Sequence, residues 1–400
     1  MGRIVSFWQR MMLALLICSA ATRVAGAEDA PVVTSLRYGT HENRVRLTFD
    51  VTSAPAFTAF LVAEPDRLIL DFPALDWQVP DDVATDIPHI SGLRHGLFRR
   101  DRARVVLELT RPVGIERIFT QAPRGTEPGR LVLDLAPISR EAFDARAGWP
   151  EQSRWQGERP VAPVPGDEEI LVAIDPGHGG VDPGATHGRL REKTVVLRFA
   201  KTLAAALEAR PGYRAYLTRE TDVFVPLAER VARAHGAGAH LLISVHADSL
   251  AEGRASGMAA YTLSEKGSDD AARALAAREN RSDVLAGADL GGESDELTRL
   301  LVELAQRGTQ VESAKLALSI IDALRGKTKI LRTRPIRQAG FRVLKAPDIP
   351  SILLEIGFLD SAADRARLTD PAWRERAAGL LVDGIAAWRK QASPGFVAPR

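Results

Sequence analysis

Four short apolar runs in the second half of the chain constrain its fold most, because each has the length of a buried strand. They cover residues 170–174, 213–217, 241–245 and 352–354. Helical patterns lie between them, and after the first run apolar residues recur at helical spacing over residues 195–207. Strands that alternate with helices are typical of an α/β domain whose mostly parallel sheet is flanked by helices. We predict such a domain over residues 169–390, followed by a short tail at 391–400.

The first half of the chain carries a degenerate internal repeat. Residues 36–72 and 93–135 share three blocks in the same order: Leu-Arg-x-Gly, Arg-Val-x-Leu and Arg-Leu-x-Leu-Asp. In the second block, Val45, Leu47 and Phe49 alternate with polar residues, which is the period-2 pattern of a half-buried strand. Two copies of such a unit predict an N-terminal all-β sandwich domain over residues 33–137.

The first residues have the features of a secretory signal. Arg3 and Arg10 precede an apolar run over residues 11–21, and small residues follow at 25–27. This run is shorter than the roughly 20 residues that span a bilayer. Lipid attachment at Cys18 is the alternative, which the bulky residue before it disfavours. We therefore expect residues 1–27 to be a signal peptide, export to the periplasm, and no stable membrane insertion.

Two further features limit the organisation and the partners of the chain. Residues 138–168 contain Pro, Gly, Arg, Glu and Trp without periodicity, which predicts a linker between the two domains. The formal net charge of +2 is close to balance and no basic block stands out, so the sequence predicts no nucleic-acid partner.

Polar residues stand where an α/β sheet places functional groups, at the carboxyl ends of its strands. His178 lies in a glycine-rich stretch after the first run, His246 directly follows the third, and Glu192 begins the first helix. Two imidazoles and one carboxylate are the ligands of catalytic zinc sites that keep a fourth position open for water. Each residue also has a structural interpretation, as a hydrogen-bonded core histidine or a helix-start acid.

Glu355 follows the last apolar run, where burial would raise its proton affinity, as a general base requires. A structural ion pair is the alternative. Arg219 and Arg230 are the cations placed nearest to this cleft. They would either bind substrate carboxylates or form surface salt bridges.

Six motifs occur in a fixed order after residue 170: DPGHGGVDPGA, REKTVVL, LTRETD, LISVHAD, LKAPDIP and SILLEIGFL. With them the chain resembles the zinc-dependent N-acetylmuramoyl-L-alanine amidases of the cell-division type. The resemblance implies that His178, Glu192 and His246 bind one Zn²⁺ ion and that Glu355 is the catalytic glutamate. The N-terminal repeat is similar to the AMIN domain, which targets cell-wall amidases to the septum or to peptidoglycan.

The resemblance implies hydrolysis of the amide between the lactyl group of N-acetylmuramic acid and L-alanine of peptidoglycan. The cellular role that it implies is septal wall splitting and daughter-cell separation. Two other functions remain open from the residues: a zinc peptidase that cuts within the stem peptide, and a non-catalytic peptidoglycan-binding protein.

A segment of about 50 residues, 265–312, is longer than a connection in an α/β domain requires. Its patterns predict helices at 271–278 and 297–304. The division amidases that the chain resembles carry a helical insertion here, which blocks the cleft until an activator protein displaces it. We therefore expect a regulatory insertion in which Glu279, or another acid such as Glu293, occupies the open zinc position.

Overall fold

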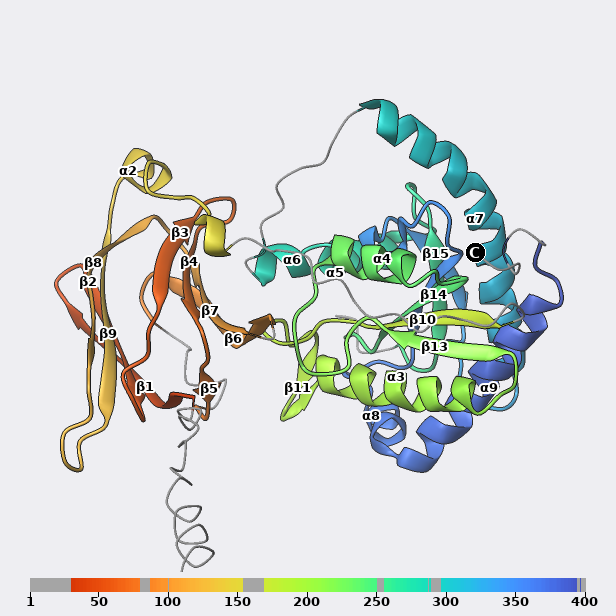
Figure 1. The fold of residues 1–400 in the computed structure, drawn as a ribbon, viewed down its shortest axis with the longest axis horizontal. Helices are drawn as coiled ribbons and strands as arrows, with labels where there is room; N and C mark the ends of the chain where they lie inside the picture. Colours follow the sequence, from red (N-terminus) through yellow and green to blue (C-terminus); the bar gives the residue numbers. More distant parts are fainter. Residues whose placement is uncertain are drawn as a thin grey trace, which may run out of the picture.

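The computed structural model describes residues 30–79, 87–99, 101–153, 169–249, 255–286, 288, 296–393 and 396. A β-rich domain and an α/β domain pack directly against each other (Figure 1). The predicted signal peptide, 1–27, lies outside these residues. Across the described part of the chain, no helix is long and apolar enough to cross a membrane.

The N-terminal domain is a sandwich of two sheets, as predicted. The sheets have the strand orders β5-β1-β2-β9-β8 and β3-β4-β7-β6. The strands are β1 (Val32–His41), β2 (Arg44–Val51), β3 (Thr58–Val62), β4 (Arg67–Phe72), β5 (Asp76–Trp77), β6 (Ile90–Arg99), β7 (Arg102–Leu109), β8 (Val113–Gln121) and β9 (Gly129–Pro137).

Each sheet of the sandwich pairs a strand from one half of the repeat with a strand from the other. In the first sheet β2 lies antiparallel to β9, with Leu47 opposite Leu133. In the second, β4 lies antiparallel to β7, with Leu68 opposite Leu107. All four leucines are fully buried, because alternate residues of each strand face the opposite sheet. The two halves of the repeat therefore share one core.

The folded N-terminal domain extends into the stretch predicted as a linker. Residues 139–153 contain helix α2 (Arg140–Asp144), whose first turn is capped by Ser139, and the short helix η2 (Glu151–Ser153). Phe143 of α2 is fully buried in the sandwich core. Ala147 and Trp149 also pack against the sandwich, but these few apolar residues are too irregularly spaced to produce a periodic pattern. The rest of the predicted linker, 154–168, lies outside the described residues.

The second domain is built on a six-stranded sheet with the order β13-β10-β14-β17-β15-β16. Its strands are β10 (Ile170–Pro176), β13 (Tyr213–Leu217), β14 (Leu241–His246), β15 (Ala259–Leu263), β16 (Ile336–Ala339) and β17 (Ser351–Glu355), and β11 (Thr186–His187) pairs with β12 (Leu190–Arg191) in a separate hairpin. The four predicted runs are strands and run parallel, while β15 runs antiparallel to β17.

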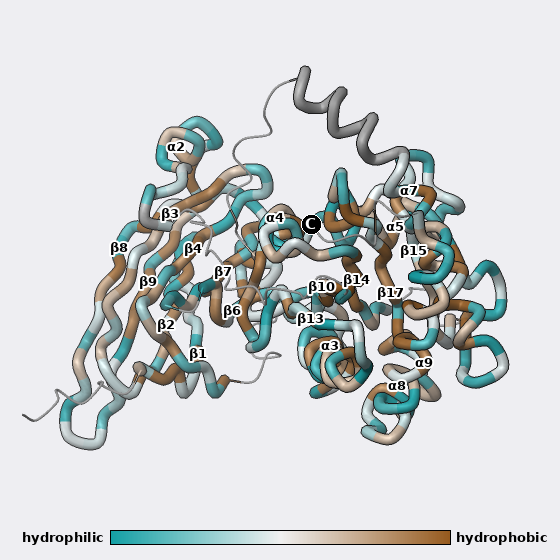
Figure 2. The backbone as a smooth tube through the Cα atoms, turned by 45° about the vertical axis from the view of Figure 1, so that its right-hand side comes forward, coloured by the Kyte–Doolittle hydropathy of each residue, from teal (hydrophilic) through white to brown (hydrophobic). Residues whose placement is uncertain are grey.

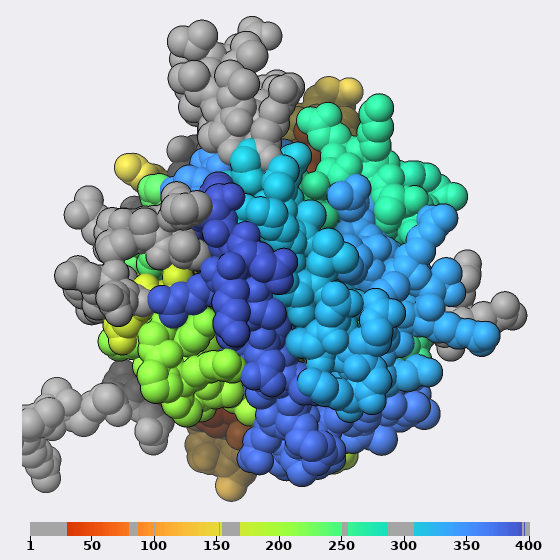
Figure 3. Space-filling view, turned by 90° about the vertical axis from the view of Figure 1, so that its right-hand side faces the viewer, coloured from red at the N-terminus to blue at the C-terminus, as the bar shows by residue number. Residues whose placement is uncertain are grey.

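Helices cover both faces of this sheet. They are α3 (Glu192–Glu208), α4 (Leu227–Gly236), α5 (Asp270–Glu279), α6 (Ser282–Leu285), α7 (Glu296–Leu324), η3 (Arg342–Leu344), α8 (Ala362–Thr369) and α9 (Pro371–Arg389). One core lies between the sheet and helices α3, α7 and α9, and the other face packs against α4, α5 and η3. The central strands are accordingly apolar along their length (Figure 2). At the end away from the sandwich, the chain after residue 310 forms the central part of the surface (Figure 3).

Candidate metal centre and active site

The loop after β10 carries His178 in a left-handed backbone conformation. His178, Gly179 and Gly180 have successive φ angles of 57°, 124° and 55°. Carbonyl groups of this turn point into the protein and are bound by two buried arginines. Arg230 donates to the carbonyl oxygens of Pro176 (2.7 Å) and His178 (2.8 Å). These hydrogen bonds stabilise the turn on the side opposite the site, and the imidazole of His178 projects into the site.

Arg219 is the second arginine behind this loop. It is 2% exposed and donates to the carbonyl oxygens of Pro176 (2.9 Å) and Gly177 (2.8 Å). Arg219 and Arg230 are therefore neither surface salt bridges nor substrate ligands, the two roles that the sequence left open. Their guanidinium groups satisfy backbone carbonyls that the tight turn leaves without partners in regular structure.

Two glycines of the DPGHGGVDPGA motif make room for the proposed ligands. A Cβ atom on Gly177 would lie 2.4 Å from Cε1 of His246. A Cβ atom on Gly184 would lie 2.6 Å from Cδ2 of His178 and 2.7 Å from Oε2 of Glu192. Both distances are far below van der Waals contact, so any larger residue at these positions would displace a side chain of the site.

The structure brings the three predicted metal ligands together. His178 Nε2 lies 3.2 Å from Glu192 Oε2, and His246 Nδ1 lies 3.2 Å from Glu192 Oε1. Glu192 is fully buried at the first turn of α3, where each of its oxygens also accepts a hydrogen bond from a backbone amide, that of Ala185 or that of Ala247. These amides fix the carboxylate between the two imidazoles.

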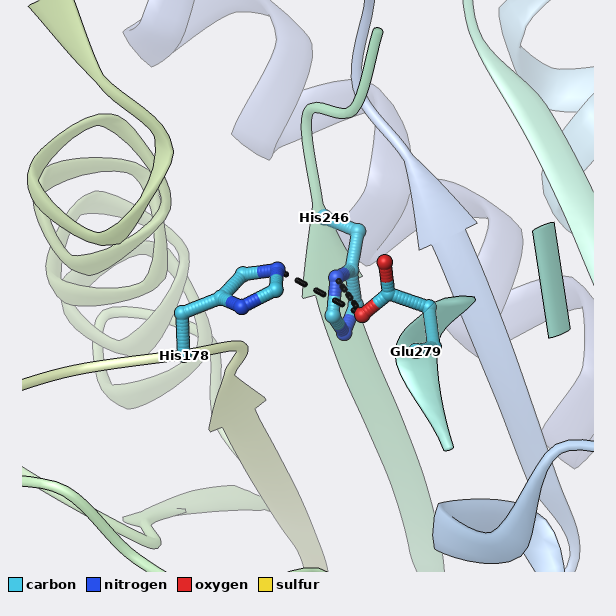
Figure 4. A group of neighbouring side chains, drawn as sticks. All are labelled: His178, His246 and Glu279. Atoms are coloured by element: carbon cyan, nitrogen blue, oxygen red, sulfur yellow. Dashed lines mark ion pairs between the residues drawn. The ribbon is translucent and has the colours of Figure 1, made fainter. Parts of the chain in front are cut away.

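A fourth side chain, Glu279 at the end of α5, enters the same cluster (Figure 4). Its Oε2 lies 3.4 Å from His178 Nε2 and 3.2 Å from His246 Nδ1, and the residue is 5% exposed. One candidate ligand atom from each of His178, His246 and Glu279 lies within 4.8 Å of the other two. Glu192 approaches the two rings with different oxygens. Glu293, the alternative acid, lies outside the described residues.

The spacing and chemistry of this cluster fit a zinc ion. Zn–N and Zn–O bonds of about 2.0–2.1 Å in a tetrahedron place neighbouring ligand atoms about 3.3 Å apart. The contacts of both histidines with Glu192 and Glu279 are 3.2–3.4 Å. His178 Nε2 is buried and has no hydrogen-bond partner among the described residues. A ring nitrogen in that situation is a free electron-pair donor once the proton is removed.

The electrostatics of the cluster favour positive charge between its carboxylates. Burial alone would lower the pKa of His178, but Glu192, Asp182 and Glu279 raise it well above its ordinary value. The pKa of His246 is also raised, because Glu279 and Glu192 outweigh its burial. Burial would raise the pKa of Glu192, but the two histidines hold it well below the usual range. Either protonation of the imidazoles or a bound metal cation would balance the negative charge of the carboxylates.

Glu355, the predicted general base, ends β17 beside His246 in the register of the sheet. It is fully buried, and burial raises the pKa of its carboxyl well above the ordinary value. Oε2 accepts a hydrogen bond from the backbone amide of Asp248 (3.1 Å), while Oε1 has no partner among the described residues. One carboxyl oxygen is therefore fixed, and the other is available to carry a proton.

Two functional neighbours were missed at the sequence level. Asp182 Oδ2 lies 2.8 Å from His178 Nδ1 and so fixes the orientation of the ring. Asp248 positions Glu355 through its amide and forms an ion pair with Arg278 of α5. The signals were an aspartate four residues after His178 and the SVHAD motif, in which Asp248 follows His246 by two residues.

An α/β sheet with two imidazoles and carboxylates at the carboxyl ends of its strands is the arrangement in which metal hydrolases hold a catalytic ion. Comparison with known proteins narrows this class. The family model of N-acetylmuramoyl-L-alanine amidases matches residues 172–387, and that of the AMIN domain matches residues 35–135. The chain therefore belongs to the N-acetylmuramoyl-L-alanine amidase family, as the sequence predicted.

Two relatives match about nine tenths of the chain, and one solved structure matches about half of it. The N-acetylmuramoyl-L-alanine amidase AmiC of Neisseria meningitidis is 32% identical over 91% of this chain and 92% of its own. AmiC of Escherichia coli is 31% identical over 89% of each chain. A solved structure, the amidase AmiC2 of Nostoc punctiforme, is 28% identical, with a TM-score of 0.39, over 56% of this chain and 99% of its own.

Proposed function

We propose that this chain is a zinc-dependent amidase that hydrolyses the bond between the lactyl group of N-acetylmuramic acid and L-alanine in peptidoglycan. Membership of the family supports the reaction. One observation carries the zinc dependence: nitrogens of His178 and His246 face the same carboxylates at 3.2–3.4 Å inside a buried cluster. In the active enzyme, His178, Glu192 and His246 would hold the ion.

Bound zinc would supply a Lewis acid and lower the pKa of a coordinated water. The remaining chemistry belongs to Glu355. Its free oxygen accepts the proton of the water that attacks the carbonyl carbon of the lactyl group. As the carbon–nitrogen bond breaks, Glu355 returns this proton to the nitrogen of alanine, which leaves as an amine. The products are a muramic acid carboxylate and a stem peptide with a free amino-terminal alanine.

The reaction is tested with purified peptidoglycan, the mature chain, and mass spectrometry of the released fragments, with and without a zinc chelator. Intact stem peptides with a free amino-terminal alanine, lost on chelation and restored by zinc, are the expected products. Cuts within the stem would identify a peptidase instead. No release from folded, zinc-loaded protein, including the variant Glu279→Ala, would favour a non-catalytic wall-binding protein.

The resting enzyme is proposed to be autoinhibited by Glu279. A carboxylate in contact with both histidines takes the position that water or substrate needs. Helix α5 is anchored there by the Arg278–Asp248 ion pair and by Asn280, which bonds the backbone of Gly340 and Arg342 at 2.8 Å each. An activator protein that withdraws α5 would open the site to peptidoglycan.

The site of action is proposed to be the periplasm, after export by the signal peptide, with the sandwich directing the enzyme to the division septum. Because the folded N-terminal domain runs to Ser153, a fluorescent fusion of residues 28–153, exported to the periplasm, tests the targeting. Enrichment at the septum is expected. An even distribution around the cell would remove the targeting role from this domain.

A further inference from the structure

The sandwich and the catalytic domain meet through main-chain contacts beside the His178 loop. Leu97 of β6 forms a bridge with Val223, and the amide of Phe224 donates to the carbonyl oxygen of Leu97 (3.1 Å). A Cβ atom on Gly180 would lie 1.8 Å from that same oxygen. Only glycine permits this close approach of the two backbones. Gly180 lies two residues after His178, so the His178 loop packs directly against β6 of the other domain.

The regulatory insertion takes part in this junction (Figure 1). Six buried residues form one apolar cluster, with two members from each of three parts of the chain. The sandwich contributes Phe98 and Val106, the catalytic domain contributes Val181 and Phe224, and the insertion contributes Ala286 and Ala288, which follow α6. Ala288 is 3% exposed and the other five are fully buried. The alanines that follow α6 are thus covered by the sandwich.

Arg67 of β4 adds a polar contact between the sandwich and the insertion. It is 3% exposed, and its guanidinium donates to the carbonyl oxygens of Pro65 (3.1 Å) and Val284. Burial, with a smaller effect of Arg104, lowers the pKa of Arg67 to about 10, so the group stays charged at neutral pH. Val284 belongs to α6, whose carbonyl end favours a cation.

This contact lies close in sequence to the proposed inhibitory carboxylate. Glu279 ends α5, α6 begins three residues later at Ser282, and Val284 lies five residues after Glu279. Between them Asp283 accepts a hydrogen bond from the amide of Leu227 (2.9 Å). Such a short, hydrogen-bonded connection transmits a displacement of α6 to the end of α5.

We propose that the sandwich domain clamps the regulatory insertion, and that Arg67 is a positioning residue which keeps Glu279 in the metal centre. The inference rests on the proposed autoinhibition by Glu279. Loss of the Arg67 side chain leaves the Val284 carbonyl buried without this charged donor. Hydrogen bonds to charged groups are strong enough that we expect about a 10-fold or larger increase in the open population of the insertion.

The test compares three variants in the full mature chain. Arg67→Met removes the hydrogen-bond donor on the sandwich side, and Ala286→Asp places a charge in the apolar cluster of the same junction on the side of the insertion. Arg46→Met is the matched control, because Arg46 pairs with Asp134 (2.6 Å) in the other sheet and its side chain is 55% exposed. Hydrogen exchange of residues 270–286 is measured in the metal-free protein, and the rate of zinc removal by a chelator in the loaded protein.

Arg67→Met and Ala286→Asp are expected to increase exchange over residues 270–286 and to accelerate zinc removal about 10-fold, whereas Arg46→Met changes neither. In a Glu279→Ala background, Arg67→Met should not accelerate zinc removal any further. In the otherwise unchanged chain, Arg67→Lys should show slower exchange and slower zinc removal than Arg67→Met. If both interface variants exchange like the control, the clamp is wrong. If exchange rises but zinc removal does not, Arg67 does not position Glu279.

Neither readout requires turnover, so this test is separate from that of the amidase itself. Failure of Glu279→Ala to release stem peptides would remove the proposed function while leaving the exchange result intact. Should Arg67→Met unfold the sandwich, Ala286→Asp decides alone, because its side chain lies outside the sandwich. A folded Ala286→Asp protein with unchanged exchange would then overturn the clamp.

Discussion

Asp182 Oδ2 lies 2.8 Å from His178 Nδ1, which leaves Nε2 of the same ring to face Glu192 and Glu279. A carboxylate on the outer nitrogen of a metal-bound histidine fixes its tautomer and increases its basicity. The side chain of Asp182 is almost fully buried, so solvent cannot substitute for it.

We therefore expect Asp182→Ala to reduce zinc affinity by about 10–100-fold. Competition with a chromophoric chelator measures the Kd. Asp383→Ala is the control, because Asp383 is an exposed partner of Arg210 and lies far from the site in the fold. An unchanged Kd in a folded Asp182→Ala protein would show that this carboxylate does not support the metal ligand.

Glu355→Gln should reduce the release of stem peptides by about 10²–10⁴-fold. The amide of glutamine can keep the hydrogen bond from Asp248 but cannot accept and return a proton. Zinc content, measured by atomic emission, should stay at the wild-type level, which separates this loss from a loss of metal. Glu208→Gln, an exposed acid at the end of α3, should behave like the wild type. Full turnover by a zinc-loaded Glu355→Gln protein would remove Glu355 from the mechanism.

Glu279→Ala should increase amidase activity in the absence of any activator by about 10-fold or more, because it removes the carboxylate that competes for the metal centre. The measurement is the initial rate of stem-peptide release. Asp270→Ala is the control on the same helix, since the Asp270 side chain is 96% exposed. Equal rates for the two variants would mean that α5 does not inhibit through Glu279.

The strands, and the positions of the candidate ligands at their ends, could be predicted because their signals are local. The runs that became β10, β14 and β17 are buried along their whole length, so each is a continuous apolar stretch, whereas β13 at the edge of the sheet is only partly buried. His246 and Glu355 directly follow such runs, and parallel strands bring their carboxyl ends to one edge of the sheet. Strand order and the reversed direction of β15 arise from long-range packing and leave no such signal.

The roles of Arg219, Arg230 and Arg67 could not be predicted, because the sequence does not distinguish an arginine in a surface ion pair from a buried arginine that binds backbone carbonyls. Arg230 is separated from its partner His178 by 52 residues, and Arg67 from Val284 by 217. Ala286 and Ala288 carry no periodic pattern that indicates an interface. Contacts of this kind depend on how whole domains pack, which the local sequence does not encode.

Asp175, at the end of β10, links the site to acid stability. Burial would raise the pKa of its carboxyl, but Arg230, Thr218 and Ser244 outweigh burial and hold the pKa below its usual value. The bonds are Arg230 Nη1 to Oδ1 (2.9 Å) and Ser244 Oγ to Oδ2 (2.7 Å). The unfolded chain, with an ordinary pKa of about 3.9, takes up the proton first as the pH falls. The stabilisation by Asp175 is therefore present above about pH 4 and is lost below it, as the pH falls through the folded pKa.

Asp175→Asn should accordingly lower the free energy of unfolding at pH 7 and flatten its decrease as the pH falls below about 4. Urea unfolding at a series of pH values, with chelator present so that metal binding does not contribute, measures both effects. Removing one partner of a buried ion pair commonly costs about 3–5 kcal/mol, and the retained amide should make the loss smaller than for Asp175→Ala. Asp383→Asn, at an exposed ion pair, should leave the pH dependence unchanged. If Asp175→Asn lost stability in acid as steeply as the wild type, the low pKa would have to belong to other carboxylates.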